Sequence, residues 1–220
     1  MKTLIIAPHP DDELIGAGGL ILRRKFEGGE IAWVIMTEMQ KTKGFSESAI
    51  EGRKNEISKI ASEMQFDTLF DLKYPTRELD RVPTLELTSK ISEIFSNFQP
   101  NEVLVPSPSD IHSDHRITYD AVVSCAKWFR HPYIERILSY ETLSETNFDY
   151  LQTNTFKPNF FIDISSHIQR KIELARIYES EFLNHPFPRS LEAIKALATL
   201  RGSMSGFNSA EAFQVILERS

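Results

Sequence analysis

The stretch TLIIAPHPDDE, residues 3–13, decides the fold predicted for this chain. Its apolar first half is typical of a buried strand, and its acidic end precedes an apolar pattern with helical spacing over 14–26. A strand, a short loop and a helix in this order are typical of an open parallel α/β sheet. Ligands bind such sheets at the carboxyl ends of the strands, where His9, Asp11 and Asp12 would lie.

A second cluster of histidine and aspartate follows another strand candidate. Residues 102–106 form an apolar run, DIHSDH at 110–115 comes shortly after it, and a helical pattern follows over 116–129. Imidazole and carboxylate groups crowded into so few residues are costly to bury unless a cation compensates them. The two clusters therefore indicate one metal site built from two loops.

The residue types in these clusters favour zinc. Catalytic zinc is held by three protein ligands and keeps its remaining position for water. His9 and Asp12 offer one nitrogen and one oxygen, and 110–115 offers the third ligand. A purely structural interpretation is that Asp11, Asp12 and Glu13 only favour the start of a helix. That interpretation explains neither His9 nor the second cluster. The spacing of these residues by itself predicts a metal site with a spare acid and base, and no more than that.

Strand and helix patterns alternate along the rest of the chain. This alternation predicts an α/β fold, a Rossmann-like three-layer α/β/α arrangement with a mostly parallel sheet, in a single domain over 1–220. Further predicted strands are 31–36, 67–72, 136–141 and 160–164, and further predicted helices are 51–65, 84 or 88 to 98, 117–129, 166–182, 191–200 and 210–217.

Composition excludes several classes of function. The formal net charge is −6 and Lys and Arg form no stripe, which argues against nucleic-acid binding. The single cysteine, Cys125, excludes an internal disulfide framework. We find no leader with a cleavage site and no apolar run near the length of a membrane span. We therefore expect a cytoplasmic protein without membrane insertion.

Together the two motifs resemble those of the LmbE-like, PIG-L family of zinc-dependent N-deacetylases, which read (A/P)HPDDE and HxDH. The likeness extends to GRKNE at 52–56, PNFFIDIS at 158–165 and AEAF at 210–213. The resemblance implies a hydrolase with one Zn²⁺ per chain that removes an N-acetyl group from an N-acetylglucosamine-type sugar or glycoconjugate and releases acetate. It also implies that a homo-oligomer can form.

Site residues follow from the same resemblance. It implies that His9, Asp12 and His115 hold the zinc and that Asp11 is the general base for a metal-bound water. Asp11 is adjacent to a ligand, and a nearby cation favours its ionised form.

The resemblance also assigns residues that would act on the substrate. It implies that His112, when charged, stabilises the oxyanion and protonates the leaving amine. It also implies that Asp114 orients a histidine, with His112 as the first choice, and that Arg53 contacts the substrate. Three positions depart from the family pattern: Thr76, where many relatives have Asp; Asp110, where some thiol-sugar deacetylases have Tyr; and Ser113, where the commonest relatives have Pro.

Two other functions remain open at this point. Carboxylates also hold Mg²⁺ or Mn²⁺, so the chain could be a phosphohydrolase that uses one of these ions. It could also be an inactive sugar-binding relative. Two histidine ligands and the lack of a Lys/Arg phosphate clamp near the motifs favour zinc and an amide, and the complete ligand set with Asp11 favours catalysis.

Overall fold

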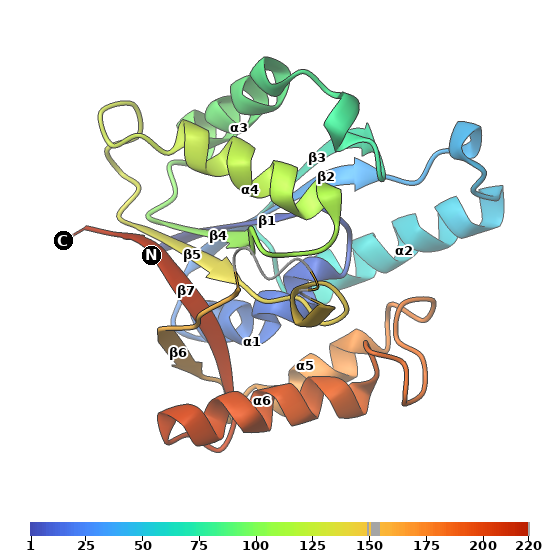
Figure 1. The fold of residues 1–220 in the computed structure, drawn as a ribbon, viewed down its shortest axis with the longest axis vertical. Coiled ribbons are helices and arrows are strands. Elements are labelled where there is room, and N and C mark those ends of the chain that lie inside the picture. The colour runs from blue at the N-terminus through green and yellow to red at the C-terminus, as the bar shows by residue number, and fades with distance from the viewer. Residues whose placement is uncertain (149, 151–154, 220) are drawn as a thin grey trace.

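Seven strands form one continuous sheet in the computed structural model, which describes residues 1–148, 150 and 155–219. The strand order across the sheet is β3-β2-β1-β4-β5-β7-β6, and helices lie on both faces (Figure 1). The strands are β1 (Lys2–Ala7), β2 (Glu30–Glu38), β3 (Thr68–Pro75), β4 (Glu102–Pro106), β5 (Arg136–Tyr140), β6 (Phe160–Asp163) and β7 (Ala210–Glu218). The helices are α1 (Asp12–Phe26), α2 (Glu47–Glu63), α3 (Thr84–Phe98), α4 (Ser113–Cys125), α5 (Ile168–Ala175) and α6 (Leu191–Ser205), with short 3₁₀ helices at Lys41–Lys43, Leu79–Arg81 and Thr146–Phe148. In the described part of the chain, no helix combines the length and apolar composition needed to cross a membrane.

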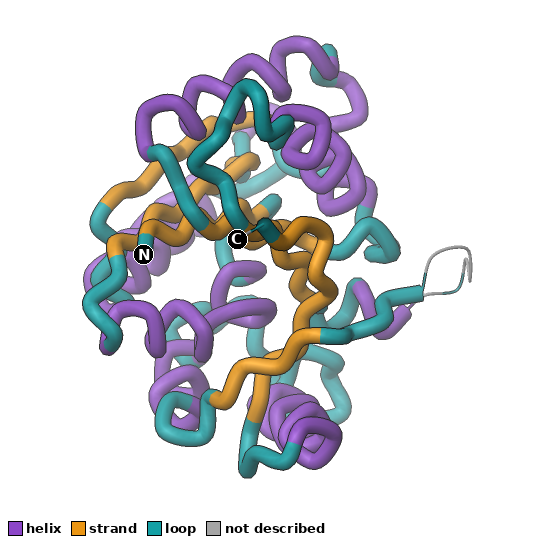
Figure 2. The backbone as a smooth tube through the Cα atoms, turned by 90° about the vertical axis from the view of Figure 1, so that its left-hand side faces the viewer, coloured by secondary structure: helices purple, strands orange, loops and turns teal. Residues whose placement is uncertain are grey.

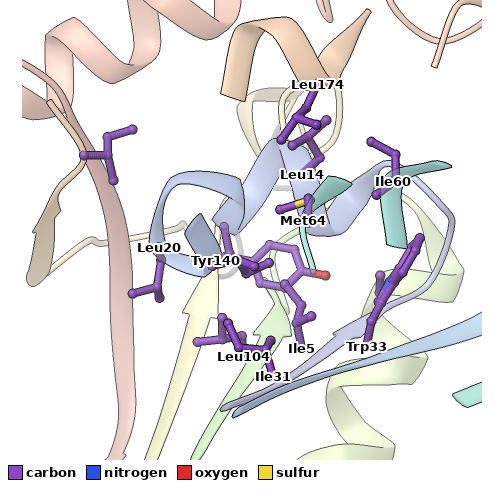
Figure 3. Packing of buried hydrophobic residues seen from close by; sticks show 14 of the residues in the cluster. Ile5, Leu14, Leu20, Ile31, Trp33, Ile60, Met64, Leu104, Tyr140 and Leu174 are labelled. Atoms are coloured by element: carbon purple, nitrogen blue, oxygen red, sulfur yellow. The ribbon is translucent and has the colours of Figure 1, made fainter. Parts of the chain in front are cut away.

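The central strand β1 contributes to hydrophobic clusters on both faces of the sheet, because successive strand residues point to opposite sides. Leu4 and Ile6 belong to the cluster that includes residues of α3 and α4. Ile5 and Ala7 belong to the other cluster, together with Tyr140 and residues of α1, α2, α5 and α6 (Figure 3). Two helical layers around a mostly parallel sheet confirm the predicted fold class.

Strand β1 is also the point at which the strand order reverses. It pairs in parallel with β2 on one side and with β4 on the other, and β1 to β5 all run in the same direction. Figure 2 shows the strands as a curved band with helices on either side. The loops that follow β1 and β4 therefore leave the same edge side by side, which is where open α/β sheets bind their ligands.

The predicted helix at 210–217 is wrong, because this stretch is strand β7. It pairs antiparallel with β5 and with β6, so that Phe213 lies opposite both Tyr140 and Phe160. A short apolar run with β-branched residues has no decisive period, and its length alone does not separate a buried helix from a strand. Pairing with two neighbouring strands decides the outcome.

Other helix boundaries also differ from the prediction. Only Ile168–Ala175 of the predicted helix 166–182 is helical, and after it the amides of Ile177 and Tyr178 bond to carbonyls three residues back, as in tight turns. Helix α2 begins before residue 51 because Ser46 Oγ accepts a hydrogen bond from the Ala49 amide.

Glycines in α1 permit close packing against Tyr140 and Ile164. A Cβ atom on Gly16 would lie 2.2 Å from the Tyr140 ring, and one on Gly19 would lie 2.6 Å from Ile164. Between them the helix is kinked at Ala17, which has a non-helical φ of −143°. The low helix propensity of glycine is thus offset by contacts that no larger residue could make.

Candidate metal centre and active site

Three side chains from the two motifs converge at the edge of the sheet. His9 lies in the loop after β1, Asp12 begins α1, and His115 lies in the first turn of α4. Asp12 Oδ2 is 3.4 Å from His9 Nδ1 and 3.2 Å from His115 Nε2. One ligand atom of each residue lies within 4.8 Å of the others. We call these three residues the metal cluster, since two nitrogens and one oxygen match the ligand set of a catalytic zinc site.

The electrostatics of the metal cluster favour a bound cation. Burial alone would lower the pKa of His9, but hydrogen bonds to Asp114 and Asp12 outweigh it and raise this pKa to about 9. Burial also opposes the charge of Asp12, yet His115 and His9 hold the pKa of Asp12 well below its usual value. The buried Asp12 carboxylate thus requires positive charge. A divalent cation would supply this charge, and its binding would release the imidazole protons.

A buried carboxylate orients each histidine of the metal cluster. Asp110 Oδ2 is 2.8 Å from His115 Nδ1, and Asp114 Oδ2 is 3.1 Å from His9 Nε2. Both carboxylates are fully buried. Hydrogen bonds of this kind fix the ring orientation and make the opposite nitrogen a better metal ligand. The role of Asp110 was not predicted, because the sequence showed it only as a departure from one group of relatives.

Asp114 contacts a histidine as predicted, but His112, the first predicted partner, is wrong. Its carboxylate contacts His9 and accepts hydrogen bonds from the backbone amides of Arg77 and Leu79, at 2.7 and 3.2 Å. It makes no bond to His112, whose Nδ1 instead accepts the backbone amide of Asp114 at 3.1 Å. Although His9, His112 and Asp114 could also surround an ion, both Asp114 oxygens are already engaged, and we assign Asp114 to orienting His9.

Replacing Asp110 with asparagine is expected to weaken zinc affinity about 10–100-fold, the usual effect of losing a carboxylate behind a histidine ligand. The measurement is competition for zinc against a chromophoric chelator. Asp120→Asn, on the same helix as His115 but outside the cluster, is the control and should bind zinc as the unmodified chain does. Equal affinity of the Asp110 variant and the unmodified chain would contradict the orienting role.

Asp11 lies beside the metal cluster in a constrained backbone conformation. Its φ is 128°, and its amide donates a 2.9 Å hydrogen bond to Glu13 Oε2. Its carboxylate accepts a 2.9 Å hydrogen bond from Arg189 Nη1. Burial and the charge of Asp12 raise the pKa of Asp11 to about 7, although Arg189 opposes this rise. A carboxylate with such a pKa can exchange a proton at neutral pH.

His112 is the N-cap of α4, and its ring is 4.5 Å from the His9 ring, centroid to centroid. Burial and the neighbouring His9 and His115 lower the pKa of His112 to about 4. The ring is therefore neutral at pH 7. Because Nδ1 accepts a hydrogen bond, its proton is assigned to Nε2, which makes this atom a hydrogen-bond donor.

Arg53 is buried against the first motif. Its Nη1 donates to the Pro10 carbonyl at 2.8 Å, its Nη2 contacts Glu181, and its Nε lies 3.2 Å from Glu56. Arg189 joins the same network through Nη2, 3.1 Å from Glu181 Oε2. These contacts occupy most of the hydrogen-bond donors of Arg53. Because Arg53 also lines the cavity, its contact with a substrate stays a prediction. Sequence reasoning missed Glu181 and Arg189, which lie in no recognisable motif.

A cavity of about 480 Å³ opens above the metal cluster. Asp11, His112 and the metal cluster are among the residues that line it. Residues of α2, of β3 and of the segment after β2 also line it, among them the apolar Phe45 and Ile50 and the basic Lys54. The cavity is large enough for a sugar and a further group, in the size range of small-molecule sites.

A family model described as "PIG-L: GlcNAc-PI de-N-acetylase" matches residues 4–126, more than half of the chain and both motifs. The chain belongs to the PIG-L family. It is 26% identical over 228 residues to a diacetylchitobiose deacetylase from Thermococcus kodakarensis, an alignment that covers 98% of this chain and 83% of the relative. The PIG-L assignment agrees with the resemblance found in the sequence, and it makes the chain a member of a family of hydrolytic N-deacetylases.

Two solved structures share the PIG-L fold of this chain. The conserved protein TT1542 from Thermus thermophilus is 26% identical to this chain and has a TM-score of 0.79. The match covers 99% of this chain and 96% of TT1542. The N,N′-diacetylchitobiose deacetylase from Pyrococcus horikoshii, solved with its inhibitor MPG, is 24% identical and has a TM-score of 0.78. That match covers 98% of this chain and 84% of the other. At this identity the second match supports the fold alone.

Proposed function

We propose that this chain hydrolyses the N-acetyl group of an N-acetylglucosamine-type sugar or glycoconjugate and releases acetate and a free amine. The observation that carries the proposal is the metal cluster in the cavity, with Asp11 beside it. The relative from T. kodakarensis is named a diacetylchitobiose deacetylase, which supports an N-acetylated amino sugar as the substrate class.

The donor set fits zinc. His9, Asp12 and His115 would hold it, and nitrogen ligands favour zinc over Mg²⁺, which prefers oxygen ligands. When bound, Zn²⁺ lowers the pKa of a coordinated water and polarises the amide carbonyl. The two histidines thus argue against the phosphohydrolase alternative, and the complete ligand set with Asp11 argues against an inactive relative.

Asp11 serves as the general base in this proposal. Its carboxylate takes a proton from the water that attacks the acetyl carbon, and Arg189 holds the carboxylate in place through Oδ2. As the carbon–nitrogen bond breaks, the same carboxyl returns the proton to the leaving amine. Acetate and an amine result, and Asp11 is ionised again for the next turnover.

His112 stabilises the oxyanion by donating a hydrogen bond from Nε2. The lowered pKa of His112 favours this neutral donor over the charged acid that the resemblance implied. A preorganised donor at the developing negative charge is worth about 10²–10³ in rate.

Cytoplasmic location, homo-oligomerisation and single-domain organisation stay predictions from the sequence.

Acetate release from N-acetylglucosamine and N,N′-diacetylchitobiose tests the proposed function. Metal-free protein given one equivalent of Zn²⁺ should release acetate and amine in equal amounts, whereas the same protein with Mg²⁺ should not. A phosphate monoester assayed in parallel with both metals should yield no phosphate. Phosphate release with Mg²⁺ and no acetate with Zn²⁺ would contradict the deacetylase proposal.

A further inference from the structure

The Asp11 backbone adopts a conformation that residues with a side chain rarely tolerate. Its φ is 128° and its ψ is −29°, so contacts elsewhere in the folded chain must hold it there. At this turn two adjacent carboxylates serve different partners. Asp12 lies 3.2 Å from His115 of the metal cluster, whereas the Asp11 carboxylate lines the cavity and accepts a hydrogen bond from Arg189.

Glu13 holds one side of this turn. Its Oε2 accepts a 2.9 Å hydrogen bond from the Asp11 amide, and its Oε1 accepts a 2.7 Å bond from the Tyr178 hydroxyl. Glu13 and Tyr178 are both fully buried, and neither lines the cavity. An exposed glutamate can cap the start of a helix, whereas burial of a carboxylate is costly. Capping alone therefore does not explain why Glu13 is buried and bonded through both oxygens.

The segment that carries Tyr178 also reaches the Asp11 side chain. Glu181 follows Tyr178 closely in the chain, and its Oε2 lies 3.1 Å from Arg189 Nη2. Arg189 in turn donates a 2.9 Å hydrogen bond from Nη1 to the Asp11 carboxylate. The segment after α5 thus contacts Asp11 by two routes, one through Glu13 to the amide and one through Arg189 to the carboxylate. Tyr178, Glu181 and Arg189 all lie outside the part of the chain that the family model matches.

We infer that Glu13 and Tyr178 are positioning residues for the reaction. Tyr178 holds Glu13, and Glu13 holds the Asp11 amide, so that the Asp11 carboxylate stays turned into the cavity beside the metal cluster. A catalytic group that is misplaced by about 1 Å can lower the rate about 10²-fold. Because neither positioning residue lines the cavity, their loss should act on kcat and not on KM. The inference rests on the proposed role of Asp11 as the general base.

Tyr178→Phe tests the inference by removing a single hydroxyl. In acetate release from N,N′-diacetylchitobiose by the zinc-loaded protein, kcat should fall about tenfold, the scale of one hydrogen bond. KM and zinc content should stay as in the unmodified chain. Glu13→Leu should lower kcat about 10²-fold, since the Asp11 amide loses its partner. Glu13→Gln should keep most of kcat, because its side-chain oxygen can accept from the Asp11 amide and its NH₂ group can donate to the Tyr178 hydroxyl.

Tyr140→Phe is the matched control. Tyr140 is also fully buried, and its hydroxyl donates a 2.9 Å hydrogen bond to the Ile6 carbonyl of β1. This variant should lower the melting temperature about as much as Tyr178→Phe and leave kcat unchanged. In a Glu13→Leu protein, Tyr178→Phe should lower kcat no further, because Tyr178 acts through Glu13. An unchanged kcat in Tyr178→Phe, or an equal loss in both tyrosine variants, would overturn the inference.

Melting temperatures of variants at residue 11 test the inference without any turnover. Since the φ of 128° favours glycine, Asp11→Gly should melt at a higher temperature than Asp11→Ala. In a Glu13→Leu protein this advantage of glycine should disappear, because the backbone is no longer held at positive φ. An advantage that persists would overturn the inference. If the unmodified chain releases no acetate, the deacetylase proposal fails, and these melting temperatures still decide whether Glu13 holds the Asp11 backbone.

Discussion

Replacing Asp11 with asparagine is expected to lower kcat by about 10²–10⁴-fold, the contribution of a positioned general base. Asparagine has nearly the same shape and can still accept the hydrogen bond from Arg189, but it cannot take a proton from water. Because Asp11 is not in the metal cluster, zinc content should stay near one equivalent. Steady-state acetate release and metal analysis of the same preparation measure both quantities.

His115→Ala is the comparison variant for Asp11→Asn. It removes one of three ligands, so it should lose both zinc and turnover, whereas the Asp11 variant loses turnover alone. Normal turnover in Asp11→Asn would remove Asp11 from the role of base. Loss of zinc in Asp11→Asn would show instead that this carboxylate contributes to metal binding.

Replacing Glu211 with glutamine is expected to lower the free energy of unfolding by about 3–5 kcal/mol, the usual cost of removing one partner of a buried ion pair. The Glu211 carboxylate accepts hydrogen bonds from the amides of Gly19 and Leu20 and from Lys171 Nζ, each at 2.7 Å. Lys171 also donates to the Ile15 carbonyl at 2.7 Å. The pair thus satisfies backbone groups that lose their helical partners where α1 is kinked.

Urea unfolding of three variants measures this effect. Glu93→Gln is the control, because its exposed pair with Lys90 contributes at most about 1 kcal/mol. In a Glu211→Gln protein, the further change Lys171→Met should recover part of the loss, since it removes the unpaired buried charge. If the urea midpoint of unfolding were the same for Glu211→Gln and Glu93→Gln, the buried pair of Glu211 and Lys171 would not stabilise the kinked helix as described.

Sequence reasoning captured the parts of the site that are local in the chain. The strand, loop and helix around His9 and Asp12 follow from hydrophobic period and helix-start signals, which act over a few residues. Strand β7 was mistaken for a helix, because its conformation depends on pairing with β5 and β6 and not on its own period.

Contacts between distant segments could not be predicted in this way. Asp114 binds His9 in place of the nearer His112, because the parallel pairing of β1 and β4 sets the two loops side by side. Arg189 reaches Asp11 from a loop far along the chain. No spacing rule relates such residues, since their meeting depends on strand order and side-chain packing.

Titration of metal-free protein with Zn²⁺, followed by zinc content and by acetate release from an N-acetylglucosaminyl glycoside, tests the central claim most directly. The account predicts that activity rises in proportion to bound zinc and reaches its plateau at one equivalent per chain, and that His115→Ala shows neither binding nor activity. Full acetate release by the metal-free protein, or by His115→Ala, would contradict it.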